Sequence, residues 1–152
     1  MTNRSMTNRS MTSLTRPPKG DVRHLAARLG ELPLFESASR ADLAEIAATG
    51  VLLTVPADWS LIWERTPADK AYVVLSGHLD IRRAGVHVVR LSAGDVVGET
   101  AILERRLRTA TVVAATQLEV LHFTAEAVQR LYAEVPAFCQ ALDVATLRHA
   151  AA

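Results

Sequence analysis

Short runs of apolar residues, many of them alternating with polar ones, fill the middle of the chain and are typical of β-strands. Between residues 51 and 123 these runs are rich in β-branched side chains and are separated by turn-forming residues. The pattern predicts strands at 51–55, 61–63, 71–76, 78–81, 86–91, 110–114 and 118–123. Many short strands at this spacing favour a sandwich or a barrel.

Apolar residues at helical spacing precede the strands and predict two N-terminal helices. Residues 21–29 carry such a pattern, and Gly30 follows them where a left-handed glycine would end a helix. Ser39 can cap the second helix, and Gly50 stops it.

Two more helices are predicted after the last strand. Thr124 can cap a helix over residues 125–134, and Pro136 breaks the pattern and restarts it. The final helix, from 137 to about 149, places apolar side chains along one stripe, namely Phe138, Leu142 and Ala145.

Composition limits the possible partners and compartments. The 152 residues fit one domain, and the formal net charge of +1 gives no global attraction to DNA or to a membrane. The lone Cys139 excludes an intramolecular disulfide and fits a reducing compartment. The chain has no apolar run of membrane-spanning length and no apolar signal-peptide core, so we expect a cytoplasmic protein. The repeated polar start predicts a disordered tail over residues 1–20.

An anion-binding site is predicted in segment 94–112, which reads GDVVGETAILERRLRTATV. Gly98 would lead into a single helical turn whose first backbone N–H groups, at Thr100 and Ala101, lack partners inside the helix. Arg108 would add a planar guanidinium that matches two phosphate oxygens. Ionised Glu99 only accepts hydrogen bonds, so it would suit a hydroxyl pair such as a ribose, and it could pair with Arg108 in an empty site.

This segment resembles the phosphate-binding cassette of the cyclic nucleotide-binding domain family. The family pattern is matched by Val97, Gly98, Glu99, Ala101, Ile102, Leu103 and the run from Arg108 to Val112, and the offset from Glu99 to Arg108 also fits. Thr100 stands where the family usually has an aliphatic residue, and Leu107 where proline is common. Neither change removes a ligand-contacting group. The lead-in LFESAS extends the resemblance to about residues 29–137.

The resemblance implies the fold. We expect a mainly β domain over residues 21–152, in which an eight-stranded antiparallel β-roll of jelly-roll type at 51–123 follows N-terminal helices at 21–50. A short cassette helix and C-terminal helices at 124–152 complete it. Glycines are expected to form the turns at 76–77 and 84–85. Two turn glycines usual in the family are replaced by Asp58 and Thr66, where we expect local strain.

The resemblance also implies the ligand and its contacts. The expected ligand is a 3′,5′-cyclic nucleotide, with cAMP favoured and cGMP possible, and no cofactor or metal is expected. The expected ligand-binding residues are Gly98, Glu99, Thr100, Ala101, Arg108, Thr109 and Ala110, with Ile81 and Val88 against the base. Thr109 could reach the phosphate or a guanine amino group. The last helix would close as a lid, with Thr146 and Arg148 meeting the base edge.

Other functional classes have less support in the sequence. The histidines are dispersed, no cysteine accompanies them, and no nucleophile, base and orienting group form a catalytic set. Arg82, Arg83 and the pair Arg105-Arg106 are expected only to keep the surface polar. No residues remain after the last helix for a DNA-binding module.

Two interpretations of the function therefore stay open. The first is a stand-alone sensor that signals to a partner protein through the last helix. The alternative is a ligand-independent interaction module, acting as a homodimer or docking subunit through that helix. The chain could also be a fragment of a larger regulator.

Overall fold

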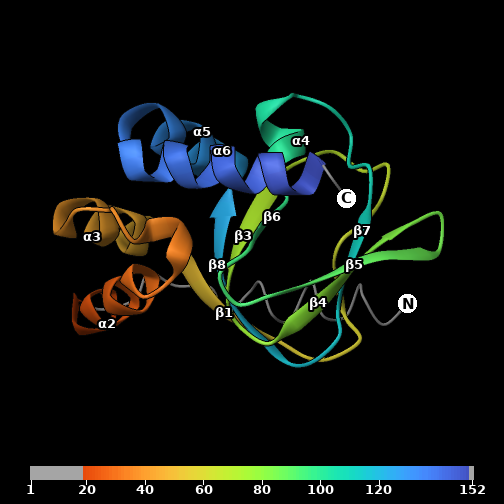
Figure 1. Ribbon diagram of the computed structural model, residues 1–152, viewed down its shortest axis with the longest axis horizontal. Helices are drawn as coiled ribbons and strands as arrows, with labels where there is room; N and C mark the ends of the chain where they lie inside the picture. Colours follow the sequence, from red (N-terminus) through yellow and green to blue (C-terminus); the bar gives the residue numbers. More distant parts are fainter. Residues whose placement is uncertain (1–18, 151–152) are drawn as a thin grey trace.

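The computed structural model describes residues 19–150, and within this range eight strands form two four-stranded antiparallel sheets (Figure 1). The strands are β1 (Val51–Val55), β2 (Ser60–Ile62), β3 (Lys70–Ser76), β4 (His78–Arg83), β5 (Val86–Ser92), β6 (Val96–Val97), β7 (Thr111–Ala114) and β8 (Leu118–Thr124). One sheet has the order β1-β8-β3-β6 and the other β2-β7-β4-β5. The predicted antiparallel β-roll is confirmed.

Flanking helices are present at both ends of the described chain. They are α2 (Lys19–Gly30), a 3-10 turn η1 (Pro33–Phe35), α3 (Arg40–Thr49), α4 (Glu99–Leu103), α5 (Ala125–Glu134) and α6 (Pro136–Ala150). The predicted caps are confirmed, since the Ser39 and Thr124 hydroxyl oxygens each accept a backbone N–H at 3.1 Å. Among these helices none combines the length and hydrophobicity needed to cross a bilayer.

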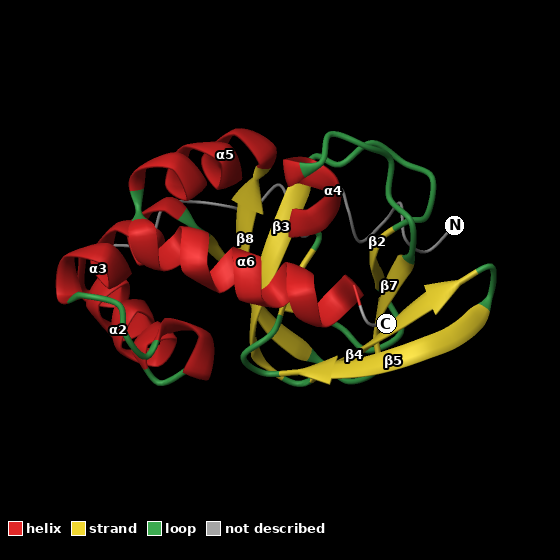
Figure 2. Cartoon of the chain, turned by 45° about the horizontal axis from the view of Figure 1, so that its top comes forward, coloured by secondary structure: helices red, strands yellow, loops and turns green. Residues whose placement is uncertain are grey.

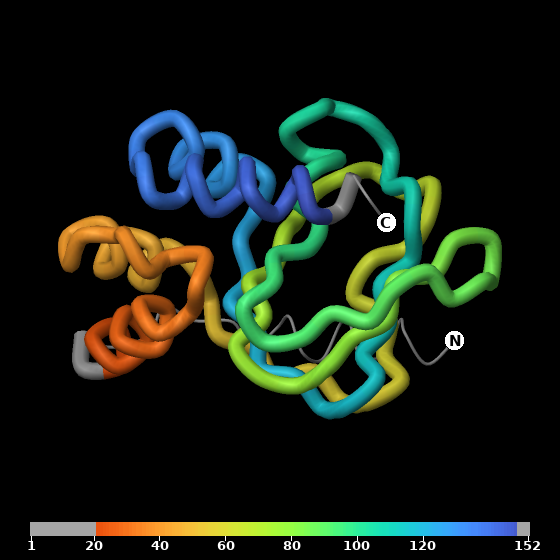
Figure 3. Tube along the Cα trace, viewed as in Figure 1, coloured from red at the N-terminus to blue at the C-terminus, as the bar shows by residue number. Residues whose placement is uncertain are grey.

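Two apolar cores explain the burial pattern of the strands. One core lies between the β1-β8-β3-β6 sheet and the helices and includes Phe123 and Phe138, and the other lies between the sheets and includes Leu79 and Val120. β3 contributes to both cores, so its five central residues are all buried. Figures 2 and 3 show α2, α3 and α5 on one side of the strands, with α6 running from them toward α4.

The N-terminal boundary and the role of Gly30 differ from the sequence prediction. α2 begins at Lys19, so two residues assigned to the disordered tail are helical, and the rest of that tail lies outside the described residues. Gly30 is the last residue of α2 and does not adopt a left-handed φ. A Cβ there would lie 3.1 Å from Leu43 Cδ1, so glycine serves the close packing of α2 on α3.

The strain predicted at two glycine-free turns is found at Asp58, whereas at the second turn it lies at the neighbouring residue Arg65. Gly77 and Gly85 adopt φ values of 93° and 78°, as the tight turns require. Asp58 adopts a left-handed φ of 72°, so the predicted strain is found there. At the second glycine-free turn the left-handed residue is Arg65, with a φ of 66°, and not Thr66. The two-residue strand β6 was not predicted, because only Val96 and Val97 belong to it.

Candidate functional site

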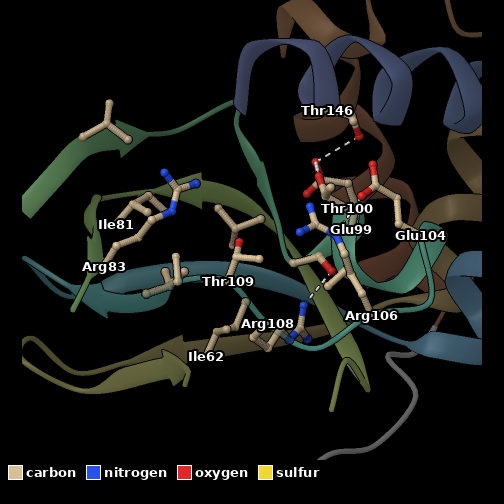
Figure 4. Close-up of a pocket in the computed structure, with 16 residues that line it drawn as sticks. Ile62, Ile81, Arg83, Glu99, Thr100, Glu104, Arg106, Arg108, Thr109 and Thr146 are labelled. Atoms are coloured by element: carbon tan, nitrogen blue, oxygen red, sulfur yellow. Dashed lines mark hydrogen bonds and ion pairs between the residues drawn. The ribbon is translucent and has the colours of Figure 1, made fainter. Parts of the chain in front are cut away.

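A pocket of about 470 Å³ lies between α4, the β2-β7-β4-β5 sheet and the last turns of α6 (Figure 4). Its lining is mixed, with apolar strand residues on one wall and polar cassette residues on the other. The residues that line it are Ile62, Ile81, Arg83, Val89, Val97, Gly98, Glu99, Thr100, Ala101, Glu104, Arg106, Arg108, Thr109, Ala110, Val112 and Thr146. A pocket of this size and lining suits a small organic ligand with a few polar groups.

Arg108 is held in this pocket by backbone carbonyl groups. Its side chain is 4% exposed, and its guanidinium donates hydrogen bonds to the Gly98 carbonyl at 2.6 Å and to the Lys70 carbonyl. Burial lowers the pKa of Arg108, while the negative charge of Asp69, whose Oδ1 lies 4.0 Å from Nη2, opposes that lowering. The cation is therefore buried and oriented with neutral acceptors as its nearest partners, which leaves its positive charge available to an anion.

The backbone around Arg108 is tied to the loop between β2 and β3. The Arg108 N–H donates to the Thr66 carbonyl at 2.9 Å, and the Arg65 N–H donates to the Arg108 carbonyl at 2.8 Å. The left-handed conformation of Arg65 turns the loop so that this pair of bonds forms. Both the main chain and the side chain of Arg108 are thus positioned by other elements.

Gly98 joins strand β6 to the cassette helix α4 in a conformation that favours glycine. Its φ is 91°, and a Cβ there would lie 2.8 Å from the Lys70 carbonyl oxygen and 3.0 Å from Arg108 Nη1. The carbonyl of Gly98 faces Arg108, and the first N–H groups of α4 follow it. The requirement for glycine here is one of both backbone conformation and space.

Glu99, the first residue of α4, places a buried carboxylate beside the pocket. The residue is 0% exposed, and its Oε2 accepts a hydrogen bond from the Thr100 hydroxyl at 3.1 Å. Its negative charge also opposes the lowering of the Arg108 pKa. A buried carboxylate next to a buried guanidinium gives the pocket one accepting end and one donating end.

The last turns of α6 rest on the same segment. Figure 4 shows Thr146 pointing from α6 toward Glu99, and the Thr146 hydroxyl donates to Glu99 Oε2 at 3.3 Å. Two residues later Arg148 Nη1 lies 3.4 Å from Asp95 Oδ1. The sequence pointed these two side chains toward the base of a ligand, but the structure places them on polar groups of the cassette.

The predicted site residues come together with one exception. All of the predicted cassette residues, together with Ile81, line the pocket, whereas Val88 does not. Its neighbour Val89, the cross-strand partner of Ile81, lines the pocket instead. Successive side chains of a strand point to opposite faces, so a one-residue error in the sequence reading selects the wrong face.

The sequence reading also missed three charged residues at the pocket. The sequence predicts only a polar surface role for Arg83 and Arg106 and no role for Glu104, yet all three line the pocket. Arg105 adopts a left-handed φ of 53° after α4, and this reversal brings Arg106 back over the helix, where its N–H donates to the Ala101 carbonyl. Arg106 Nε also pairs with Glu104 Oε1 at 2.7 Å.

Residues 19–150 hold no cluster of three or more His, Cys, Asp or Glu side chains that could bind a metal ion. In the pocket, a buried cation and helix N–H groups face a buried carboxylate. Such a set of groups suits a ligand that carries both an anion and hydroxyl groups.

Comparison with known proteins identifies a family and several relatives. The model of the family described as "Cyclic nucleotide-binding domain" matches residues 52–135. A cAMP-dependent protein kinase regulatory subunit of Aspergillus niger is 33% identical over 111 residues, which are 72% of this chain and 27% of the relative. A cGMP-dependent protein kinase of Caenorhabditis briggsae is 40% identical over 60 residues, which are 40% of this chain and 8% of the relative.

The fold recurs in solved structures. A cAMP-binding acyltransferase from Mycobacterium smegmatis superposes with a TM-score of 0.68 at 25% identity, over 86% of this chain and 42% of that one. The chain spans about a quarter of the length of the Aspergillus niger relative, since 27% of that protein is covered. The similarity therefore concerns one domain of proteins that are considerably longer.

Proposed function

The chain belongs to the cyclic nucleotide-binding domain family, and from this premise we propose that it is a regulatory sensor that binds cAMP. Domains of this family are regulatory and not catalytic, and we propose no enzymatic activity and no cofactor for this chain. The observation that carries the proposal is the buried Arg108 fork beside the start of α4 and the buried Glu99, all in one pocket.

We propose a division of the pocket that follows the charges. The Arg108 guanidinium and the N–H groups of Thr100 and Ala101 would hold the cyclic phosphate, because both present donors to an anion. Glu99 and the Gly98 backbone would bind the ribose 2′-hydroxyl. Apolar strand residues, Ile81 and Val89, would contact the base.

Selection between the two bases depends on Thr109 in this proposal. Relatives named for cAMP and for cGMP both match this chain. Thr109 lines the pocket and could donate to the phosphate or accept from a guanine amino group. One hydrogen bond between neutral groups is worth about 0.5–1.5 kcal/mol, so we expect cGMP to bind within about two orders of magnitude of cAMP.

We further propose that the domain passes its signal to a partner protein through α6. This helix contacts the cassette from outside the β-roll through the side chains of Thr146 and Arg148. A ligand shifts a conformational equilibrium only by its difference in affinity for the two states, so the coupling must act through such contacts. No binding to DNA or to a membrane is proposed.

Isothermal titration of the full chain with cAMP and with cGMP tests the proposal. We expect saturable binding of both nucleotides with a stoichiometry of one per chain. AMP, which has the same base but an open phosphate, is the matched control ligand. Failure of both cyclic nucleotides to bind at high micromolar concentration would refute the sensor function.

The alternative, a ligand-independent interaction module, is favoured by one observation on α6. Val144 and Leu147, one helical turn apart, are exposed large apolar residues on this helix. Unlike the sensor, such a module has no use for a buried Arg108 in an open pocket, because the burial of a charge costs free energy. Loss of self-association or partner binding in Leu147→Ser, together with no nucleotide binding by the full chain, would support it.

A further inference from the structure

Arg106 brings a second guanidinium to the end of the pocket where we place the phosphate. Both Arg106 and Arg108 line the pocket, and Figure 4 shows them at the end near Glu99, with Arg83 at the other end. The Arg106 N–H donates to the Ala101 carbonyl at 3.0 Å, which fixes the start of the side chain against α4. The side chain of Arg106 is therefore held beside the same short helix that would contact the phosphate.

The guanidinium of Arg106 is oriented by Glu104 and keeps donors for a further acceptor. Its Nε lies 2.7 Å from Glu104 Oε1, and the two side chains are 44% and 51% exposed, so the pair lies at the mouth of the pocket. A guanidinium has five N–H donors in a rigid fork, and a single carboxylate cannot accept from all of them. Donors on Nη1 and Nη2 thus remain for a bound anion.

The charges along the pocket also require Arg106 once an anion is bound. Three arginines and two glutamates line the pocket, which is an excess of one positive charge. A cyclic phosphate is a diester with one negative charge, so the ligand and the lining together are neutral. Without Arg106 the same complex would carry one net negative charge in a partly desolvated site, which is unfavourable.

We propose that Arg106 is a second phosphate ligand, which is held at Nε by Glu104 and donates from Nη1 and Nη2 to the cyclic phosphate bound at Arg108. This inference rests on the proposed function and adds a residue to it. A contact with the phosphate does not depend on the base, so Arg106 strengthens the binding of cAMP and cGMP by the same factor. Thr109, in contrast, acts on the difference between the two nucleotides.

The first test is calorimetric titration of the full-length Arg106→Gln variant with cAMP and with cGMP. We expect both affinities to fall about five- to twentyfold, because charge-assisted hydrogen bonds at a half-exposed side chain are lost. Arg105→Gln is the matched control, since Arg105 is the neighbouring arginine and does not line this pocket. It should bind both nucleotides like wild type. Thermal melting of each variant shows whether the protein is folded.

The same substitution in a Glu104→Gln background separates a contact from an indirect effect of charge. Removal of Arg106 also uncovers the negative charge of Glu104, which by itself would repel the phosphate. If Arg106 contacts the phosphate, the loss of affinity persists when Glu104 is already neutral. A loss that disappears in this background would come from Glu104 and would overturn the inference.

Phosphorothioate ligands provide a readout that a structural role would not change. The Rp and Sp isomers of cAMPS carry sulfur in place of one or the other exocyclic phosphate oxygen, and sulfur is the weaker acceptor. The loss caused by Arg106→Gln should be smaller for the isomer whose sulfur faces Arg106 than for the other isomer. Equal losses for both isomers would show that Arg106 does not contact the phosphate.

Failure of the inference and failure of the proposed function are distinguishable. Normal cAMP binding by Arg106→Gln, or unequal losses for cAMP and cGMP, would overturn the role of Arg106 and leave the sensor function in place. Absence of cAMP and cGMP binding to wild type would instead refute the proposed function, and the inference with it.

Discussion

Neutral carbonyl groups accept the hydrogen bonds of the buried guanidinium of Arg108, and the Asp69 carboxylate lies farther away, at 4.0 Å. We predict that Arg108→Ala weakens cAMP binding by about 2–5 kcal/mol, because it removes a charge-assisted fork and leaves the phosphate charge unpaired in a desolvated site. Titration calorimetry on the two proteins measures the difference.

Arg105→Ala is the control for this prediction. Arg105 belongs to the same segment but does not line the ligand pocket, so its loss should change the affinity by less than about 0.5 kcal/mol. Equal losses in Arg108→Ala and Arg105→Ala would show that the phosphate does not bind at Arg108. Thermal melting of both variants separates loss of binding from loss of folded protein.

Gly98 gives a second prediction at the scale of single residues. Gly98→Ala should destabilise the fold and weaken cAMP binding at least about tenfold, because the new Cβ meets the Lys70 carbonyl at 2.8 Å and Arg108 Nη1 at 3.0 Å. Gly85→Ala is a matched control, since Gly85 also has a positive φ but a Cβ there meets nothing within 4 Å.

The two glycine substitutions share the cost of a left-handed alanine, roughly 1–2 kcal/mol. Any extra destabilisation in Gly98→Ala, measured by denaturant unfolding, reports the contacts with Lys70 and Arg108. If both variants lost the same stability and both kept cAMP affinity, the close packing of Gly98 would have no role in the site.

The loop between β2 and β3 offers a test at the scale of structural elements. Arg65 adopts a left-handed φ of 66° so that the loop can pair with the backbone of Arg108. Arg65→Gly should stabilise the protein by about 0.5–1 kcal/mol, because relief of the left-handed strain exceeds the extra entropy of glycine in the unfolded chain.

Thr66→Gly, one position along, should destabilise the protein. Thr66 is not left-handed, and its hydroxyl donates to the Trp63 carbonyl at 2.6 Å, a bond that glycine loses. Comparison of the two melting temperatures locates the strained residue of the loop. A higher melting temperature for Thr66→Gly than for Arg65→Gly would place it at Thr66.

Sequence periodicity predicted most elements because most are long enough to show a repeat. Seven strands, both capped helices and the Pro136 boundary were found in this way. The two-residue strand β6 was not predicted, because it is too short to show a repeat and its pairing with β3 depends on tertiary contacts. The sequence also could not show which of Val88 and Val89 faces the pocket. Both are valines, and only the register between β4 and β5 decides between them.

The cassette residues could be predicted because they lie close together in the sequence, whereas the other residues that line the pocket could not. Gly98, Glu99 and Arg108 belong to one short segment with a recognisable order. Arg83 comes from a different strand, and Arg106 reaches the pocket only through the left-handed turn at Arg105. Neither position differs in residue type from a surface arginine, so no pattern distinguishes it.

At the scale of the whole molecule, the β1-β8-β3-β6 sheet contains a titratable group that links stability to pH. His122 on β8 lies opposite Val51 on β1 and Tyr72 on β3. Burial lowers the pKa of His122, and the positive charge of Lys70 lowers it further. The unfolded chain therefore binds the proton more readily than the folded one.

We predict that the free energy of unfolding falls as the pH drops below about 6.5, the ordinary value for histidine, toward the lower pKa of the folded state. This contribution is complete above about pH 6.5 and is lost below it. His122→Gln should show a smaller fall between pH 7.5 and 5 in denaturant unfolding. An equal fall in both proteins would assign the pH dependence to other groups.

The order of strands in the first sheet has a consequence for the way this chain is made. β1 and β3 both pair with β8, which is synthesised much later. Val51 of β1, for example, can pair with His122 only after β8 has been made. At ribosomal rates of about 5–20 residues per second, the apolar strand β1 remains without its partner for roughly 4–14 s after it is synthesised. Unpaired strands with apolar faces associate with other chains in such an interval. We therefore expect the yield of folded protein in a cell to depend on the speed of translation between these two strands and on the supply of chaperones.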